Sequence, residues 1–227
     1  ALMQTSIAAR FSSFAYPLSL YNGKMLQSNS TDAEISNVGY AQALTSTGFT
    51  VYNWTTVNNS GDDYVSWTFR KAPKFFDVVT YTGNGVQGRT ISHNLDHLVG
   101  MLMIKCTSHS SDWSVQHRML NPNKYLAINE NHSAQTDGLR FHSTAAGTST
   151  FSVGSGNAVN GSGRTYVAYL FAHHNTGNPG EFGPNLDQDI IKCGSYTGNG
   201  SSTGPEIDLG FEPQLIIIKK SSDSANW

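Results

Sequence analysis

Tyr81-Thr82-Gly83-Asn84-Gly85 occurs twice in this chain, because it returns as Tyr196-Thr197-Gly198-Asn199-Gly200 about 115 residues later. An apolar run that ends in lysine follows each copy, and then a serine-rich turn that reaches tryptophan: Met101–Lys105 and Leu215–Lys219, then Ser110–Trp113 and Ser224–Trp227. A fixed period of this kind indicates tandem copies of one structural unit. We therefore expect a repeat protein.

A second set of matches links the beginning of the chain to its later part. Lys24–Leu26 resembles Lys124–Leu126, and Tyr64–Phe69 resembles Tyr166–Phe171. Two shorter matches lie between these: Gly48–Val51 with Thr150–Val153, and Val57–Gly61 with Val159–Gly163. The chain therefore holds parts of more than two copies of the unit.

These matches predict three pieces. Residues 1–74 form the second half of a β unit, residues 75–189 form a complete β-sandwich unit with an inserted loop at 173–189, and residues 190–227 start a further unit. The inserted loop is rich in His, Asn, Gly and Pro, which is typical of an exposed connection. A unit interrupted at Trp227 would leave apolar surface open. We therefore expect that the natural protein continues, or that the pieces complete each other.

The residue patterns predict an all-β fold. Tyr64–Phe69 alternates apolar and polar residues, which favours a half-buried strand. Leu215–Ile218 is apolar on both faces and mostly β-branched, which favours a central strand. The glycine-rich stretch 83–88 is predicted to be a hairpin turn. A unit of ~100 residues built from short strands and polar turns is typical of a β-sandwich.

Composition excludes several classes of function. The net charge is −2 and only 13% of the residues are charged, so no basic excess is present to bind nucleic acid. No apolar run approaches the ~18 residues of a membrane-spanning helix. The two cysteines, Cys106 and Cys193, do not make a disulfide framework, and we expect both to be free and buried.

Neither a nucleotide site nor a zinc site is predicted. The stretch 83–88 matches G-x-G-x-x-G, but no helix pattern follows it and the second copy has Thr203 in place of the third glycine. Without a helix N-terminus the loop has no dipole to hold a pyrophosphate. No Cys/His spacing fits structural zinc. The paired histidines are predicted to lie on the surface or in turns: His93, His97, His173 and His174.

We find no residue pattern that predicts catalysis. Val159–Gly163 is a glycine turn rather than a nucleophile elbow. Nothing in the sequence favours a glycosidase pair such as Asp112 with Glu130. Asp187 and Asp189 supply fewer oxygen ligands than calcium requires. We therefore predict that the chain is not an enzyme and has no cofactor and no metal site.

Aromatic residues near polar turns suggest a carbohydrate contact, because flat sugar faces stack on exposed rings. Trp113 and Trp227 occupy the same repeat position, which favours a packing role. Trp54 has no aromatic counterpart in the complete unit, so it is the candidate glycan contact. His117 and Arg118 form either a polar binding edge or a solvated strand face. Six N-x-Ser/Thr sequons occur, at Asn29, Asn53, Asn58, Asn131, Asn160 and Asn199.

Trp67–Gly85 is very similar to a recurrent stretch of marine bacteriophage tail-fibre and appendage proteins, which carry an uncharacterised tandem repeat domain. The resemblance covers about residues 24–227, and these segments also carry it: Ile91–Leu95, Tyr166–His173 and Cys193–Gly200. It departs at Asp96–Gly100, which lacks the glycine and the proline of related repeats, so we expect a remodelled loop there. The resemblance implies tandem β-sandwich units of the lectin-like or jelly-roll type, and it implies no catalytic residues.

From the resemblance and the repeats we predict a phage virion structural protein. It would be a segment of a tail fibre or surface appendage, outside the cell on the virion surface, that mediates host-surface or glycan adhesion. The implied partners are other virion proteins, a host-surface glycan and further copies of the chain, with a trimer expected by analogy with phage fibres. The alternatives are a secreted carbohydrate-binding module or adhesin of a cell, and a polysaccharide-degrading enzyme on the same scaffold.

Overall fold

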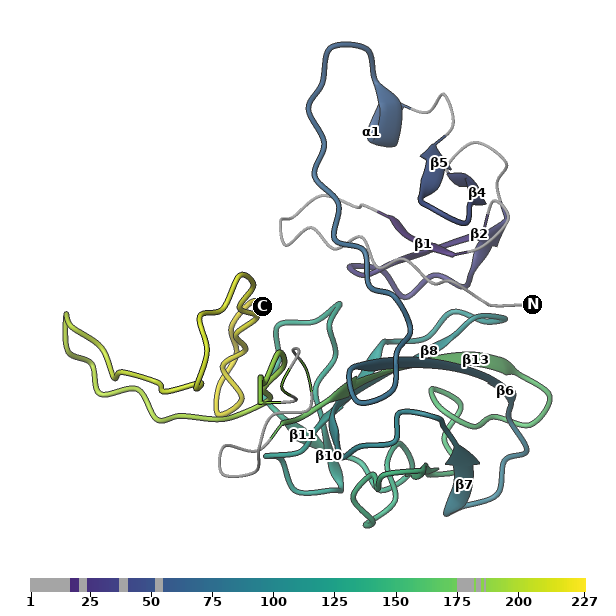
Figure 1. Cartoon of the computed structure of the whole chain (residues 1–227). Helices are drawn as coiled ribbons and strands as arrows, with labels where there is room; N and C mark the ends of the chain where they lie inside the picture. The colour runs from purple at the N-terminus through teal and green to yellow at the C-terminus, as the bar shows by residue number, and fades with distance from the viewer. Residues whose placement is uncertain are drawn as a thin grey trace.

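The computed structural model describes residues 17–20, 24–36, 41–51, 55–174, 182, 185 and 187–227. Within these residues the expected all-β class is confirmed: several small antiparallel sheets are joined by turns and by one short helical segment, α1 (Thr55–Asn58). Tandem sandwiches or jelly rolls are not evident among them. Figure 1 shows the N-terminal strands above the main body and the C-terminal residues as an arm at its side.

A four-stranded antiparallel sheet with the order β6-β13-β8-β9 forms the centre of the protein. Its strands are β6 (Phe76–Thr82), β8 (Val99–Cys106), β9 (Ser114–His117) and β13 (Thr165–Ala172). β13 pairs along its length with both neighbours, so that Tyr169 lies opposite Val78 on one side and Met103 on the other. Apolar, aromatic residues fill β13 and are buried from Tyr166 onward, as expected for a strand enclosed on both edges and both faces.

Each face of this sheet has its own core, because alternate residues of β13 point in opposite directions. On one face, Leu170 packs in a cluster with Phe151 of a second sheet. That sheet has two strands, β7 (Arg89–Ser92) and β12 (Thr150–Val153). On the other face, Tyr169 packs with Trp113 and with Leu26 from the N-terminal part. The core on this face is therefore completed by Leu26, which comes from the N-terminal part of the chain.

The N-terminal part contains two small sheets. Their strands are β1 (Pro17–Leu20), β2 (Lys24–Gln27) and β3 (Ile35–Ser36) in one, and β4 (Ala41–Leu44) and β5 (Phe49–Val51) in the other. In the β2–β3 pair, Lys24 lies opposite Ser36. A later pair, β10 (Lys124–Tyr125) with β11 (Gln135–Thr136), places Lys124 opposite Thr136. These are matching positions of the internal repeat, so the chain builds the same antiparallel pair twice.

Two segments predicted as strands from the sequence are not strands in the structure, and those predictions are wrong. Tyr64–Phe69 and Leu215–Ile218 have no regular secondary structure and are largely exposed. Their repeat counterparts lie in β13 and β8, which pair with each other and are buried. The apolar patterns are alike, but a strand forms only where a neighbour takes up its backbone N–H and C=O groups.

The glycine-rich loop 83–88 is a turn but not a hairpin, so that detail of the prediction is also wrong. It leads from β6 in the central sheet to β7 in the second sheet, and these two strands do not pair. A Cβ on Gly83 would lie 2.2 Å from the carbonyl oxygen of Gly161, so only glycine fits this position. The buried side chain of Asn160 holds the loop, because its amide donates to Asn84 Oδ1 at 3.1 Å.

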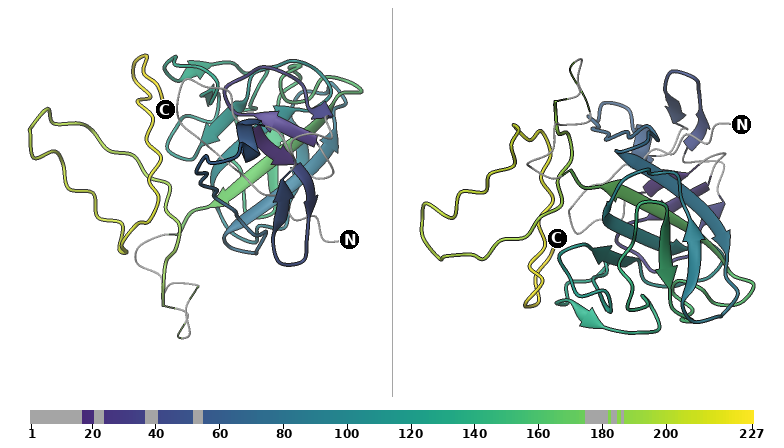
Figure 2. Two further views of the ribbon diagram at one scale, coloured as in Figure 1. Left: turned by 90° about the horizontal axis from the view of Figure 1, so that it is seen from above. Right: turned by 60° about the horizontal axis from the view of Figure 1, so that its bottom comes forward.

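The C-terminal residues 190–227 contain no strand in the structure. In both views of Figure 2 they run out from the body and return to it near Trp227. In the part of the chain that the structure describes, no helix reaches the length and apolar character that a bilayer crossing requires.

Candidate functional site

The N-terminal part meets the central sheet in a junction built on Lys105 and Trp113. Trp113 is fully buried, and its indole N–H donates to the carbonyl oxygen of Gln27 at 2.9 Å. The buried ammonium group of Lys105 donates to the carbonyl oxygens of Thr31 at 2.9 Å and Ser111 at 2.5 Å. Both side chains fill apolar space with their carbon atoms and bind backbone carbonyls with their polar ends.

Two backbone hydrogen bonds close the same junction. The amide of Ser111 donates to the carbonyl oxygen of Thr31 at 2.7 Å, and the amide of Glu34 donates to that of Thr107 at 2.9 Å. The loop after β2 is therefore joined to the loop after β8 by main-chain and side-chain donors together.

The same arrangement occurs where residues 127–134 meet the C-terminal arm, residues 190–227. The indole N–H of Trp227 donates to the carbonyl oxygen of Ala127 at 2.9 Å. The ammonium group of Lys219 donates to the carbonyl oxygens of Asn131, at 3.1 Å, and Ala225. The tryptophan and the lysine thus make the same contacts at both places.

The backbone bonds of this second junction also repeat. The amide of Ala225 donates to the carbonyl oxygen of Asn131 at 2.7 Å, and the amide of Ala134 donates to that of Ser221 at 2.8 Å. Every donor and acceptor stands at the repeat position of its counterpart: Gln27 and Ala127, Thr31 and Asn131, Glu34 and Ala134, Lys105 and Lys219, Thr107 and Ser221, Ser111 and Ala225, Trp113 and Trp227.

Only the lysine and the tryptophan contribute side chains to this set of bonds. The other positions act through their backbone, so their side chains are free to differ, as Thr31 and Asn131 do. One further backbone hydrogen bond recurs at matching repeat positions. The amide of Ala72 donates to the carbonyl oxygen of Phe76 at 2.9 Å, and the amide of His174 donates to that of Ile191 at 3.1 Å. We call the contacts of Lys105 and Trp113 with residues 27–34 the first junction. The contacts of Lys219 and Trp227 with residues 127–134 are the second junction.

Burial governs the electrostatics of the first junction. It lowers the pKa of Lys105 to about 8, although Cys106, Asp112 and Asp32 act in the opposite direction. Burial also lowers the pKa of Lys219 in the second junction. In both cases the carbonyl oxygens replace the water that an exposed ammonium group would bind.

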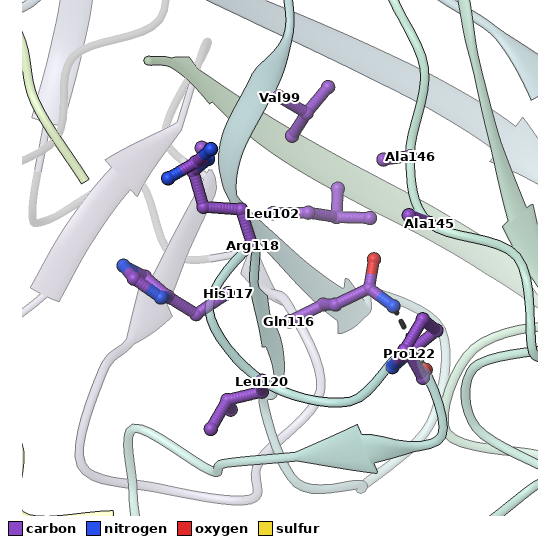
Figure 3. A pocket seen from close by; sticks show the side chains of 10 residues that line it. Val99, Leu102, Gln116, His117, Arg118, Leu120, Pro122, Ala145 and Ala146 are labelled. Atoms are coloured by element: carbon purple, nitrogen blue, oxygen red, sulfur yellow. Dashed lines mark hydrogen bonds between the residues drawn. The ribbon is translucent and has the colours of Figure 1, made fainter. Parts of the chain in front are cut away.

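The candidate glycan contacts are only partly described. Trp54 lies outside the described residues. His117 and Arg118 lie at the end of β9 and line a cavity of about 120 Å³. Figure 3 shows the side chain of Gln116 pointing toward Pro122, to whose carbonyl it donates at 3.0 Å, whereas His117 and Arg118 point to the other side.

The polar groups of His117 and Arg118 bind the local backbone. The amide of Met119 donates to Nδ1 of His117 at 3.3 Å, and the guanidinium of Arg118 donates to the carbonyl oxygen of Cys193 at 3.5 Å. Burial, and then the Arg118 charge, lower the pKa of His117. The cavity is smaller than the ~300–1,000 Å³ of usual ligand pockets, so the glycan role of these residues stays a prediction.

The prediction that the paired histidines lie on the surface or in turns is wrong for three of them. His93, His173 and His174 are buried rather than on the surface. Nε2 of His174 lies 2.8 Å from the carbonyl oxygen of Lys74, which ties the end of β13 to the linker before β6. Over the described residues, no three His, Cys, Asp or Glu side chains are placed to hold a metal ion.

Both cysteines are free, as expected, and Cys106 is fully buried, but the prediction that both are buried is wrong for Cys193. Cys193 is less enclosed by its neighbours, but its sulfur still packs against the carbonyl oxygen of Ala172 at 3.7 Å. Burial raises the pKa of the Cys193 thiol to about 12.

Asp112 and Glu130, the acidic pair considered in the sequence analysis, both accept hydrogen bonds from neighbouring side chains. Burial would raise the pKa of Asp112, but hydrogen bonds from Arg140 and Asn129 outweigh this and hold the pKa below its usual value. Asn129 also donates to Glu130 at 3.3 Å and accepts a bond from the Trp113 amide at 2.9 Å. These polar side chains therefore position the tryptophan of the first junction.

The sequons divide by exposure. Asn160 is buried and uses its side-chain amide within the fold, so it cannot accept a glycan in the folded chain. Four others are exposed: Asn29, Asn58, Asn131 and Asn199. Asn53 lies outside the described residues.

Sequence reasoning found the junction tryptophans but missed the junction lysines. The packing role predicted for Trp113 and Trp227 agrees with their contacts. The sequence also pointed to Lys105 and Lys219, because each ends an apolar run at the same repeat position. A lysine retained at the end of a buried strand, where a shorter or apolar residue would be easier to bury, indicates a polar partner inside the fold.

The fold and the two matching junctions define an all-β protein with a repeated contact between its parts. The chain belongs to the family of the domain of unknown function DUF7483, whose match covers residues 21–227. Comparison with curated proteins and with solved structures finds no match.

We predict that Trp113→Phe loosens the first junction and leaves the central sheet intact. The change keeps an aromatic ring but leaves the Gln27 carbonyl without its donor, which costs about 1–3 kcal/mol. Hydrogen exchange measures the loosening of the junction. The amides of Glu34 and Ser111 should exchange faster, while those of β13 keep their protection. Trp67→Phe, which changes a tryptophan outside the junction, serves as the matched control. Equal loss of protection throughout the chain would contradict a local role.

We also predict that Lys105 makes stability depend on pH. Its folded pKa of about 8 lies below the ~10.4 of an unfolded lysine, so the unfolded chain binds more protons between these values. The free energy of unfolding should therefore rise as the pH increases from 8 to about 10, and the cost of the buried charge is full below pH 8. Urea unfolding of the unaltered chain and of Lys105→Met across this range isolates the effect of Lys105. The tyrosines, which also titrate at high pH, are the same in both chains. Parallel pH profiles of the two chains would refute the prediction.

Proposed function

We propose that this chain is a section of a phage tail fibre or surface appendage, a virion structural protein that serves host-surface or glycan adhesion. The observation that carries the proposal is the recurrence of one set of hydrogen bonds at the first and second junctions. A contact that joins two different surfaces and copies itself along a chain extends the chain in one direction. Such an array suits a fibre.

The finer fold is part of the same proposal. We propose tandem β units with a period of about 115 residues, each a lectin-like β-sandwich once both its halves are present. We propose piece boundaries at 74/75 and 189/190, as the internal matches of the sequence predict. In support, the four-stranded sheet and the β7–β12 sheet pack on each other through one core. The resemblance to marine phage appendage proteins adds the virion setting, and repetition adds avidity to weak surface contacts.

The alternative is a secreted carbohydrate-binding module or adhesin of a cell. The four exposed sequons favour it, because they would be accessible to a glycosylation machinery in a eukaryotic secretory pathway. Both proposals use the repeated junction, and they differ in where the protein is found.

Detection in virions separates these proposals. We predict that peptides of this chain are present in density-purified virions of the phage that encodes it, and that an antibody against the chain labels a fibre or appendage in electron micrographs. An antibody against a replication protein of the same phage is the control and should not label particles. Recovery of the chain from the medium of uninfected cells, with none in virions, would favour the secreted adhesin.

Adhesion makes a separate prediction. The purified chain should bind glycans of the host surface, and Trp54→Ala, His117→Ala and Arg118→Ala should each weaken that binding because sugar rings stack on tryptophan and bind charged edges. A glycan array with titration of the best ligand measures this, with Leu139→Ala as an exposed control. Unchanged affinity in all three variants would remove these residues from the site.

A further inference from the structure

We propose that the cavity at the end of β9 is a subsite for the acetamido group of an N-acetylated sugar. The methyl group would lie against the apolar wall of the cavity, and the amide N–H would donate to Oε1 of Gln116. This inference rests on the glycan adhesion proposed above, and it names the class of sugar that the chain would select.

The cavity contains one buried acceptor without a donor, the side-chain oxygen of Gln116. This side chain is only 7% exposed, and its amide nitrogen donates to the carbonyl oxygen of Pro122 at 3.0 Å. A backbone carbonyl can only accept, so this bond fixes which end of the amide is the nitrogen. In Figure 3 the oxygen points away from Pro122, toward Leu102 and Ala145 on the cavity wall. Among the residues that the structure describes, no donor reaches this oxygen.

The Gln116 oxygen sets the first requirement for a ligand. A buried acceptor without a donor costs free energy, and a ligand that brings an N–H or O–H group into the cavity removes that cost. A ligand without such a group leaves the oxygen unpaired. The ligand must therefore carry a donor close to the part that fills the cavity.

The wall of the cavity sets the second requirement, which is a small apolar group. The residues that line it beside Gln116 include these: Val99, Leu102, Leu120, Pro122, Ala145 and Ala146. Ala145 is exposed, so the cavity reaches the surface there. Its volume of about 120 Å³ is below the ~300–1,000 Å³ of pockets that enclose a whole ligand. The cavity therefore suits one substituent of a sugar, with the ring outside.

Main-chain hydrogen bonds fix the walls of the cavity. The amide of Arg118 donates to the carbonyl oxygen of Gly100 at 2.9 Å, and the amide of Leu120 donates to that of His117 at 2.8 Å. Together with the bond between Gln116 and Pro122, they hold the end of β9 and the turn that follows it. A site that is formed in advance does not lose binding energy to the ordering of its own residues.

An acetamido group meets both requirements, because its N–H lies beside a carbonyl group that carries a methyl group. A hydroxyl group supplies the donor but leaves the apolar wall uncovered, whereas an alkyl group covers the wall but leaves Gln116 unpaired. The side chains of His117 and Arg118 point to the other side in Figure 3. With no cation directed into the cavity by these two residues, and with an oxygen acceptor inside it, an uncharged group is favoured over a sulfate or a carboxylate.

Matched sugars test the subsite on the unaltered chain. Methyl glycosides of N-acetylglucosamine and N-acetylgalactosamine are compared with those of glucose and galactose, which have a hydroxyl group in place of the acetamido group. Saturation-transfer NMR should show the strongest transfer to the acetyl methyl protons. Titration should give about tenfold tighter binding of the N-acetylated sugars, from one hydrogen bond and one buried methyl group. N-butanoylglucosamine should lose this advantage, because its longer acyl chain exceeds the cavity.

Two variants locate the effect. Gln116→Met removes the acceptor at similar size, and Ala145→Leu places a larger side chain at the exposed rim, where it fills the cavity with little risk to folding. Each should reduce the tenfold advantage of the N-acetylated sugars to about equal binding. Leu139→Ala is the matched control, because Leu139 is exposed and does not line the cavity, and it should keep the advantage.

The possible results separate this inference from the proposed function. Equal affinity for the two sets of sugars would overturn the acetamido subsite and leave glycan adhesion in place. An advantage of N-acetylated sugars that persists in Ala145→Leu would place their site elsewhere, which also overturns it. Absence of binding to every sugar, here and on the glycan array, would count against adhesion as well, whereas detection of the chain in virions would be unaffected.

Discussion

The structure depends on side-chain donors that reach from one part of the chain to the backbone carbonyls of an earlier part. In the first junction an indole N–H and a buried ammonium group bind the carbonyls of Gln27 and Thr31. A buried carbonyl without a donor costs free energy, so each of these bonds favours the one position of the loop in which its carbonyl meets the donor. The second junction repeats the geometry with Trp227 and Lys219. A protein built on such contacts is organised along its length.

The first junction lies on a face of the central sheet that is covered by residues from the N-terminal part of the chain. One face of the central sheet is closed by the β7–β12 sheet, and the other face takes up Leu26 and Phe69 from the preceding part of the chain. The core on that face is therefore completed by residues from the preceding part of the chain.

Much of this organisation could be predicted from the sequence. The two copies of the Tyr-Thr-Gly-Asn-Gly stretch gave the period, and the shared position of Trp113 and Trp227 gave the packing role of both. The candidate site was harder to predict. Trp113 and Lys105 donate to the backbone carbonyls of Gln27 and Thr31. Every residue type has a backbone carbonyl, so the side chains at these two positions do not reveal their part in the junction. The buried state of His93 was missed for a related reason, since burial depends on what packs above it.

The sequence by itself determined the all-β class, the repeat and the pattern of apolar residues. Those properties are local, because periodicity and glycine position act through a residue and its near neighbours. Only the tertiary structure decided which apolar segments become strands. β13 and Tyr64–Phe69 have closely similar patterns, but β13 lies between two strands that take up its backbone groups. Among the residues that the structure describes, no strand pairs with Tyr64–Phe69. A strand is stabilised by its partners, and partners are set by the fold.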